Sequence, residues 1–275
     1  MKNLLYYLLA AAALLGCGEL HAQHTIGFNV GTGMATGRFE PTQETKPIFG
    51  NLTAGFSWRY YSSQRVVGGI GADLEFIQQG FQIATNTSRV DDPKDYLYYA
   101  RHVNSLMLPF VWQPHAYIKR RVRIYGEAGV TFSYNLSSTY SMETMVGDQK
   151  VTEEGDYHFK TPRDNRWGYG LVGGGGIAVL IKQFEINIRA RYYFGYSDIL
   201  RSRNKYSSSI EGFTLTPLRS PMDNLMITFG VNYRFSKEGF ESWKPRRKRP
   251  KMKHGFSFDE AGGSSIGRST IQSNR

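Results

Sequence analysis

Residues 224–235, with the sequence NLMITFGVNYRF, alternate between two kinds of side chain. The odd positions are all large and apolar or aromatic, whereas the even positions are mostly polar or small. A period of two indicates a β-strand with one apolar face and one polar face. The segment is long enough to cross a bilayer as a tilted strand, which takes roughly 9–11 residues. It ends on aromatic residues, which favour the membrane–water interface. A membrane barrel would need further strands of this kind elsewhere in the chain.

Seven more segments show the same alternation, and the connections between them alternate in length, beginning and ending with a long one. Short periplasmic turns, longer external loops and an even strand number are typical of outer-membrane barrels, whose two ends lie in the periplasm. Pro109 is a weak point of the fourth strand because proline cannot donate to the ladder. The eight predicted strands lie at about 25–34, 49–61, 65–83, 101–112, 122–136, 166–181, 184–196 and 224–235.

The predicted fold is therefore all-β: an eight-stranded antiparallel up-and-down transmembrane β-barrel. A soluble lipocalin-like barrel is the alternative, since it also has eight strands. That alternative would pack Phe56, Trp58 and Phe132 inside one small barrel and leave Arg189 and Glu127 outside. Residue size and the alternation of loop lengths favour aromatic side chains that face lipid. The mean hydropathy of −0.42 excludes a bundle of transmembrane helices.

The start of the chain is typical of an exported protein. Lys2 precedes an apolar run from Leu4 to Leu15, which is too short for a spanning helix and resembles the core of a signal peptide. We predict a signal peptide over residues 1–22, a barrel over 23–236 and an outer-membrane location. Residues 14–17 also resemble a lipobox, in which case Cys17 would carry a lipid. Cleavage after residue 22 would leave no cysteine and hence no disulfide.

Charged residues recur on the polar face of the predicted strands. An eight-stranded barrel is only wide enough for side chains to fill it, and buried charges must be paired. We therefore predict a salt-bridged plug inside the barrel, with a narrow solute pore as the alternative. The predicted network consists of Arg59, Asp73, Glu75, Arg123, Glu127, Glu185, Arg189, Arg191 and Arg234.

Catalysis has little support in the sequence. There is no HExxH motif and no pair of histidines at a metal-ligand spacing, so no metal, cofactor or catalytic residue is predicted. Residues 168–173 match GxGxxG by letter, but they lie within a predicted strand rather than between a strand and a helix. A lipid A-modifying enzyme would need a histidine near the external rim, for which His102 and His158 are the candidates.

The last segment, residues 237–275, differs from the rest. It contains 10 Lys and Arg against 4 Asp and Glu, a net charge of +6. It cannot bury a core, so we predict a disordered periplasmic tail. The tail is either simply solvated or docks to an acidic periplasmic partner. A nucleic-acid partner is not expected for an exported protein. The residues predicted to bind a partner are Arg246, Arg247, Lys248, Arg249, Lys251 and Lys253.

Four short motifs of the sequence carry a resemblance to a known family. They are the Ala22-Gln23 junction, Leu108-Pro109-Phe110, Tyr192-Tyr193-Phe194-Gly195 and Tyr233-Arg234-Phe235. With these motifs the chain resembles small outer-membrane barrels of Bacteroidota, and most of all the PorT family of the type IX secretion system. The resemblance implies an eight-stranded barrel with an accessory or assembly role in the export of proteases and adhesins, and no known active site. Its implied partners are outer-membrane lipid and secretion-machinery proteins.

Overall fold

The computed structural model describes residues 23–61, 68–87, 90–118, 121–201 and 217–235. The predicted signal peptide, Cys17 and the basic tail lie outside the described residues.

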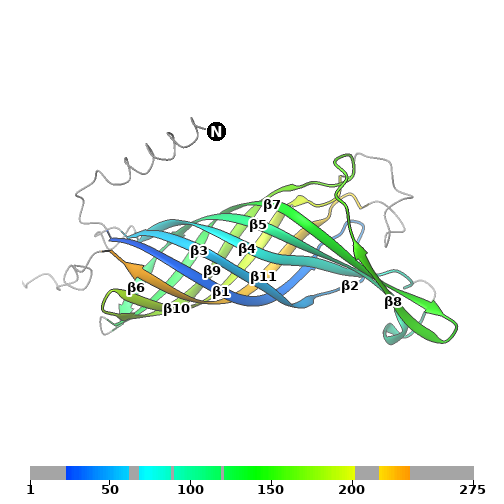
Figure 1. Ribbon diagram of the computed structural model, residues 1–275, viewed down its shortest axis with the longest axis horizontal. Coiled ribbons are helices and arrows are strands. Elements are labelled where there is room, and N and C mark those ends of the chain that lie inside the picture. Colours follow the sequence, from blue (N-terminus) through cyan, green and yellow to red (C-terminus); the bar gives the residue numbers. More distant parts are fainter. Residues whose placement is uncertain (1–22, 62–67, 88–89, 119–120, 202–216, 236–275) are drawn as a thin grey trace, which may run out of the picture. The chain divides into compact units, whose positions relative to one another are not determined.

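Eight long antiparallel strands form a closed barrel (Figure 1). Each strand pairs with the next along the ring, and β1 closes it against β11, from Thr25 opposite Arg234 to Gly37 opposite Met222. Closure leaves no free edge on the barrel wall. The predicted eight-stranded antiparallel barrel is confirmed. Its strands are β1 (Gln23–Gly37), β3 (Ile48–Tyr61), β4 (Gly69–Ala84), β5 (Tyr98–Gln113), β7 (Val122–Val146), β9 (Trp167–Ile181), β10 (Phe184–Asp198) and β11 (Pro221–Arg234).

Three shorter strands and one short helix lie outside this ring. β2 (Thr45–Lys46) pairs with β4, whereas β6 (His115–Ile118) and β8 (Gln149–Asp156) both pair with β7. The 3-10 helix η1 (Pro93–Asp95) precedes β5. Across the residues that the structure describes, no helix is long and apolar enough to span a membrane.

Two predicted connections prove to contain strands. The predicted long loop at 137–165 is wrong over residues 137–156, because β7 continues to Val146 and the chain turns back into β8. The predicted turn at 113–121 contains β6. The alternation of one apolar and one polar face exists only where a strand has lipid on one side. Residues 143–146 of β7 pair only with β8 among the described strands, so the end of this hairpin projects past β5 and lacks the pattern.

The outer face of the barrel carries an apolar belt bordered by aromatic side chains. We call the end with the connections after β3, β5 and β9 the short-turn end, and the opposite end the long-loop end. Trp167 packs on Tyr134 at the long-loop border with ring centroids 4.8 Å apart, and Phe184 packs on Tyr233 at the short-turn border at 5.5 Å. Aromatic girdles at both borders are a feature of transmembrane barrels.

Pro109 sits within β5 without ending it. It pairs with Thr131 of β7, whereas the β4–β5 ladder has no pairing between Ala72 opposite Phe110 and Glu75 opposite Met107, although its register is unchanged on either side. The missing N–H of proline therefore coincides with a gap in the ladder to β4.

Candidate functional site

The interior of the barrel is a stack of layers. Alternate residues of a strand point to the same side, so the inward residues of β4 pass through every layer in order. From the short-turn end they are Asp73, Glu75, Ile77, Gln79 and Phe81, and each is at most 3% exposed. The lumen is thus charged near the middle, then apolar, then neutral and polar, then apolar at the long-loop end.

The charged layer joins three arginines to three carboxylates from four different strands. Each of the six side chains belongs to a residue that is 5% exposed or less, and the three positive charges balance the three negative ones. Buried ions are tolerated only when they are paired and hydrogen-bonded, and this set meets that condition by mutual contact. The members are Arg59, Asp73, Glu75, Glu127, Arg189 and Arg191.

Arg191 lies at the centre of this layer and contacts all three carboxylates. Its Nη1 lies 2.8 Å from Asp73 Oδ2 and 2.9 Å from Glu75 Oε1, and its Nη2 lies 2.6 Å from Glu127 Oε2. The planar guanidinium fork makes this possible, because its five donors point in fixed directions.

The other two arginines complete the layer. Arg189 Nη2 lies 2.8 Å from Glu75 Oε1, and its Nη1 lies 3.3 Å from Asp73 Oδ2. Arg59 binds both carboxylate oxygens of Asp73, with Nη2 donating to Oδ2 at 2.9 Å. The Tyr193 hydroxyl donates to Glu75. Charge and hydrogen bonding therefore cross-link β3, β4, β7 and β10 from within.

A second ion pair lies closer to the short-turn end. Arg123 pairs with Glu185, and Asn232 Nδ2 donates to Glu185 Oε1 at 3.1 Å. The Arg123 guanidinium also lies over the Tyr61 ring, 4.3 Å from its centroid. Residues of both charged groups line a pocket of about 10 Å³. Such a volume suits about one water molecule, not a solute.

The next two layers were not predicted. An apolar layer is formed by Ile77, Met107, Val111, Val172, Tyr193 and Met226. Above it, Gln79 Nε2 donates to Ser105 Oγ at 2.7 Å, and Asn224 Nδ2 donates to Gln79 Oε1 at 2.9 Å. The polar residues stand at inward positions of their strands, so the alternation of inward and outward positions along each strand could have identified them. The apolar ones contradict the simple rule that apolar residues face lipid.

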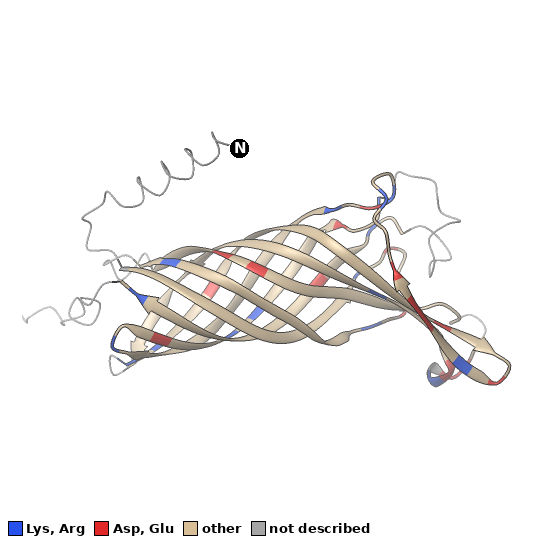
Figure 2. Cartoon of the chain, in the orientation of Figure 1, with Lys and Arg blue, Asp and Glu red and all other residues tan. Residues whose placement is uncertain are grey.

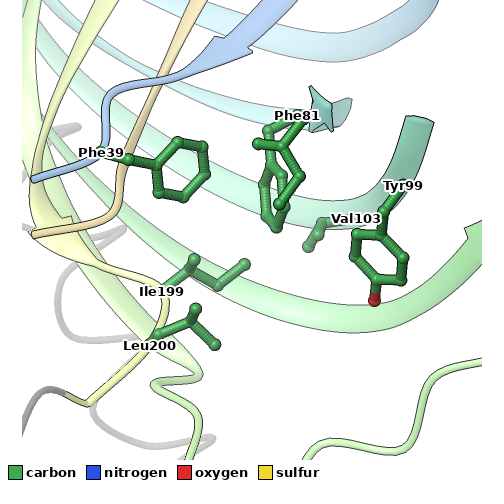
Figure 3. Close-up of a cluster of buried hydrophobic side chains, with 7 residues drawn as sticks. Phe39, Phe81, Tyr99, Val103, Ile199 and Leu200 are labelled. Carbon is green, nitrogen blue, oxygen red and sulfur yellow. The ribbon is translucent and has the colours of Figure 1, made fainter. Parts of the chain in front are cut away.

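A cluster of apolar side chains caps the lumen at the long-loop end (Figure 3). Phe39 and Phe81 pack edge to face with centroids 5.0 Å apart. Some members come from the wall, whereas Phe39, Ile199 and Leu200 come from connections that fold inward. The complete cluster is Phe39, Phe81, Ile83, Tyr99, Val103, Ile199 and Leu200.

The connection between β8 and β9 adds a polar group above the cap. The buried Arg101 stacks over the Tyr157 ring at 3.5 Å, and the Tyr157 hydroxyl donates to Asp164 Oδ1 at 2.9 Å. Lys160 N donates to Asp164 Oδ2 at 2.9 Å. Burial raises the pKa of Tyr157 above its ordinary range, and its hydrogen bond to Asp164 acts in the same direction. Through these layers and caps the lumen is filled rather than open.

The nine residues predicted to form the interior network are all buried in the barrel. Six form the charged layer, and Arg123 and Glu185 form the second pair. Arg234 lies at the short-turn end, where its backbone N–H donates to Gln183 O. The six tail residues predicted to bind a partner lie outside the described residues.

The two candidate histidines are not brought together. His102 lines a shallow hollow on the outer wall with Ser141 and Glu154, whereas His158 is exposed in the connection after β8 and does not line it. Strand register explains why residues far apart in the sequence line this hollow. Ala100, Ser141 and Glu154 form one row across β5, β7 and β8. Within the described ranges, no group of three or more His, Cys, Asp or Glu is placed to hold a metal ion.

Comparison with known proteins identifies the family. Residues 20–201 match the family described as the outer membrane protein beta-barrel domain. A comparison with curated proteins returned no match. Among solved structures, Ail of Yersinia pestis is 14% identical over 78% of this chain and 100% of its own, with a TM-score of 0.32. OprG of Pseudomonas aeruginosa is 12% identical over 78% and 96%, with a TM-score of 0.38. Neisserial surface protein A is 10% identical over 77% and 97%, with a TM-score of 0.34. The family match covers well over half of the sequence, and the chain belongs to the outer-membrane β-barrel domain family.

Proposed function

We propose that this protein is a non-enzymatic outer-membrane barrel that acts as an accessory or assembly component of protein secretion, similar to PorT of type IX secretion. In this proposal the short-turn end, both termini and the basic tail lie in the periplasm, and the long loops lie outside the cell. The protein would act through these exposed surfaces on lipid-embedded and periplasmic secretion proteins, not through its lumen.

The filled lumen is the observation that carries this proposal. A solute crossing the barrel would have to pass the three-arginine, three-carboxylate layer and then the apolar cap at Phe39 and Phe81. Opening the charged layer would leave buried ions without partners, which costs on the order of 3–5 kcal/mol when a single partner is lost. A small-solute porin is therefore the less favoured function.

Two measurements test the proposal. The purified full-length chain, reconstituted in planar bilayers beside a known porin as control, should give no stable single-channel conductance. A strain lacking the gene should retain its secreted proteases and adhesins inside the cell, and the full chain should restore their export. Steady conductance steps would instead assign a porin, and normal export in the deletion strain would remove the secretion role.

The hollow at His102 supports a second candidate function, modification of lipid A. A histidine, a hydroxyl and a carboxylate share this hollow on the outer wall, where a lipid headgroup could reach them. In that case the deletion strain and a strain carrying His102→Ala would show the same altered lipid A by mass spectrometry, while His158→Ala would not. Unchanged lipid A in all three strains would exclude this function.

A further inference from the structure

Strand β8 leaves one edge of a sheet exposed beyond the closed barrel. Among the described residues it pairs only with β7, and seven of its eight residues are exposed. The hairpin extends past the end of the barrel wall (Figure 1). Val146, at its tip, lies ten residues beyond the last belt residue Leu136, which corresponds to roughly 30 Å of strand. Edge strands are templates for pairing with another chain.

The hydrogen-bonding groups on the free edge can be assigned. Tyr157 N donates to Ser138 O at 2.9 Å, which continues the β7–β8 register and marks this pair as hydrogen-bonded. Hydrogen-bonded and non-hydrogen-bonded positions alternate along an antiparallel strand. The odd residues of β8 therefore bond to β7, and the even residues present their backbone groups outward. The outward set is Lys150, Thr152, Glu154 and Asp156.

The edge is held in place by its surroundings. Lys150 Nζ donates to Lys94 O at 2.9 Å and to Tyr96 O at 3.2 Å, which ties the hairpin to the segment around η1. Tyr98 N donates to Glu143 Oε2 at 3.1 Å on the β7 side. A strand that is already extended and braced loses little conformational entropy when a partner pairs with it.

The charge on this hairpin is opposite in sign to that of the whole chain. Residues 139–156 contain five acidic residues and one lysine, a net charge of −4, whereas the chain carries +11. Figure 2 shows acidic positions along the hairpin. Apolar side chains are exposed near the tip, with Val146 at 65%, Met145 at 48% and Val151 at 44%. The acidic residues are Glu143, Asp148, Glu153, Glu154 and Asp156.

We propose that the free edge of β8 binds an extended, basic segment of a partner protein, which adds to the sheet as a further strand. Backbone bonds to the even residues would supply affinity, and Lys or Arg side chains of the partner would face Glu153, Glu154 and Asp156. The same charges disfavour a second copy of this chain, because pairing β8 with β8 sets like charges opposite each other. The site is independent of the secretion role proposed above.

The test uses the full-length chain in lipid nanodiscs. The probe is a peptide of roughly ten residues that alternates Lys with Thr or Val, a length that matches one strand. Thr152→Pro removes an outward N–H and spares the bonds to β7, whereas Thr152→Val keeps that N–H and serves as the matched control. Binding should weaken about tenfold or more in Thr152→Pro, a loss of about one backbone hydrogen bond together with its strand geometry. It should be unchanged in Thr152→Val.

Further arms separate strand addition from simple charge attraction. A peptide methylated at alternate backbone nitrogens should lose affinity, and so should a peptide with Glu in place of Lys. The double variant Glu153→Gln, Glu154→Gln leaves the backbone intact and should bind the basic peptide more weakly, with less dependence on salt. Strand addition would be overturned if Thr152→Pro bound the basic peptide as tightly as the wild type does, and the methylated peptide bound the wild type as tightly as the unmethylated one. Failure of the basic peptide to bind, or concentration-dependent dimers cross-linked through Thr152→Cys, would overturn the proposed partner.

Discussion

At the scale of single residues, glycine determines where the buried charges can lie. Arg59 stands opposite Gly71 on β4, and Glu75 stands opposite Gly55 on β3. A Cβ at Gly71 would lie 2.5 Å from Arg59 Cδ, and one at Gly55 would lie 2.8 Å from Glu75 Cγ. Each charged side chain therefore lies flat across the glycine of the neighbouring strand, and this brings the arginines and carboxylates within contact distance of one another.

The loss of Asp73 should lower stability strongly, since this residue contacts Arg59, Arg189 and Arg191. Asp73→Ala should lower the free energy of unfolding by about 3–5 kcal/mol, because it leaves buried guanidinium charge uncompensated. Urea unfolding in lipid vesicles would measure the loss. The control Asp148→Ala, in the exposed turn of the hairpin, should change stability by roughly 0.5 kcal/mol or less.

A double variant checks the cause of that loss. Arg59→Met with Asp73→Leu replaces one ion pair by apolar side chains and should recover much of the stability lost in Asp73→Ala. If the single variant Asp73→Ala unfolds at the same urea concentration as the wild type, the charged layer does not stabilise the barrel.

At the scale of elements, the connections at the long-loop end fold inward and cover that end of the lumen. Ile199 and Leu200 follow β10 directly and turn into the lumen, and the segment after β8 places Tyr157 against Arg101. These connections are ordered by apolar burial and by a few polar contacts, so their order should respond to a change at one contact.

The ionisation of Tyr157 gives such a change. The pKa of Tyr157 in the folded protein is raised above the ordinary value for tyrosine, whereas an unfolded tyrosine titrates at about 10. Below that pH both states are protonated, and the contribution of Tyr157 to the order of the segment is fully present. As pH rises above it the unfolded form loses its proton first, so the stability of the segment falls with pH.

The difference in phenolate absorbance between the wild type and Tyr157→Phe isolates this single group. Its midpoint should lie above pH 10, the ordinary value for tyrosine. A midpoint at or below that value would mean that the ring is not buried against Arg101 and Asp164.

At the scale of the whole molecule, the barrel follows from the sequence because lipid imposes a repeated rule. Phe229 and Ile227 of β11 alternate with inward residues, and the same alternation recurs in all eight strands. The rule fails where lipid is absent. The β7–β8 hairpin has no lipid face, and Ile77 and Met226 are apolar yet point into the lumen. The charged positions of the lumen could be read from strand parity, but which arginine meets which carboxylate depends on register across the ring.

The closed ring also predicts that the barrel can fold without residues 237–275. Every wall strand is complete at Arg234, and β11 already bonds to β1 along its length. A chain that ends at residue 236 should therefore fold to the same barrel, with a urea midpoint within error of the full chain, because no described strand contact lies beyond Phe235. Heat-modifiable migration on gels and urea unfolding measure this.

The shortened chain should fail to restore export in the deletion strain if residues 246–253 bind a periplasmic partner. The full chain with those Lys and Arg residues changed to Gln is the matched test of charge. Full export by both shortened and neutralised chains would show that the tail is only solvated.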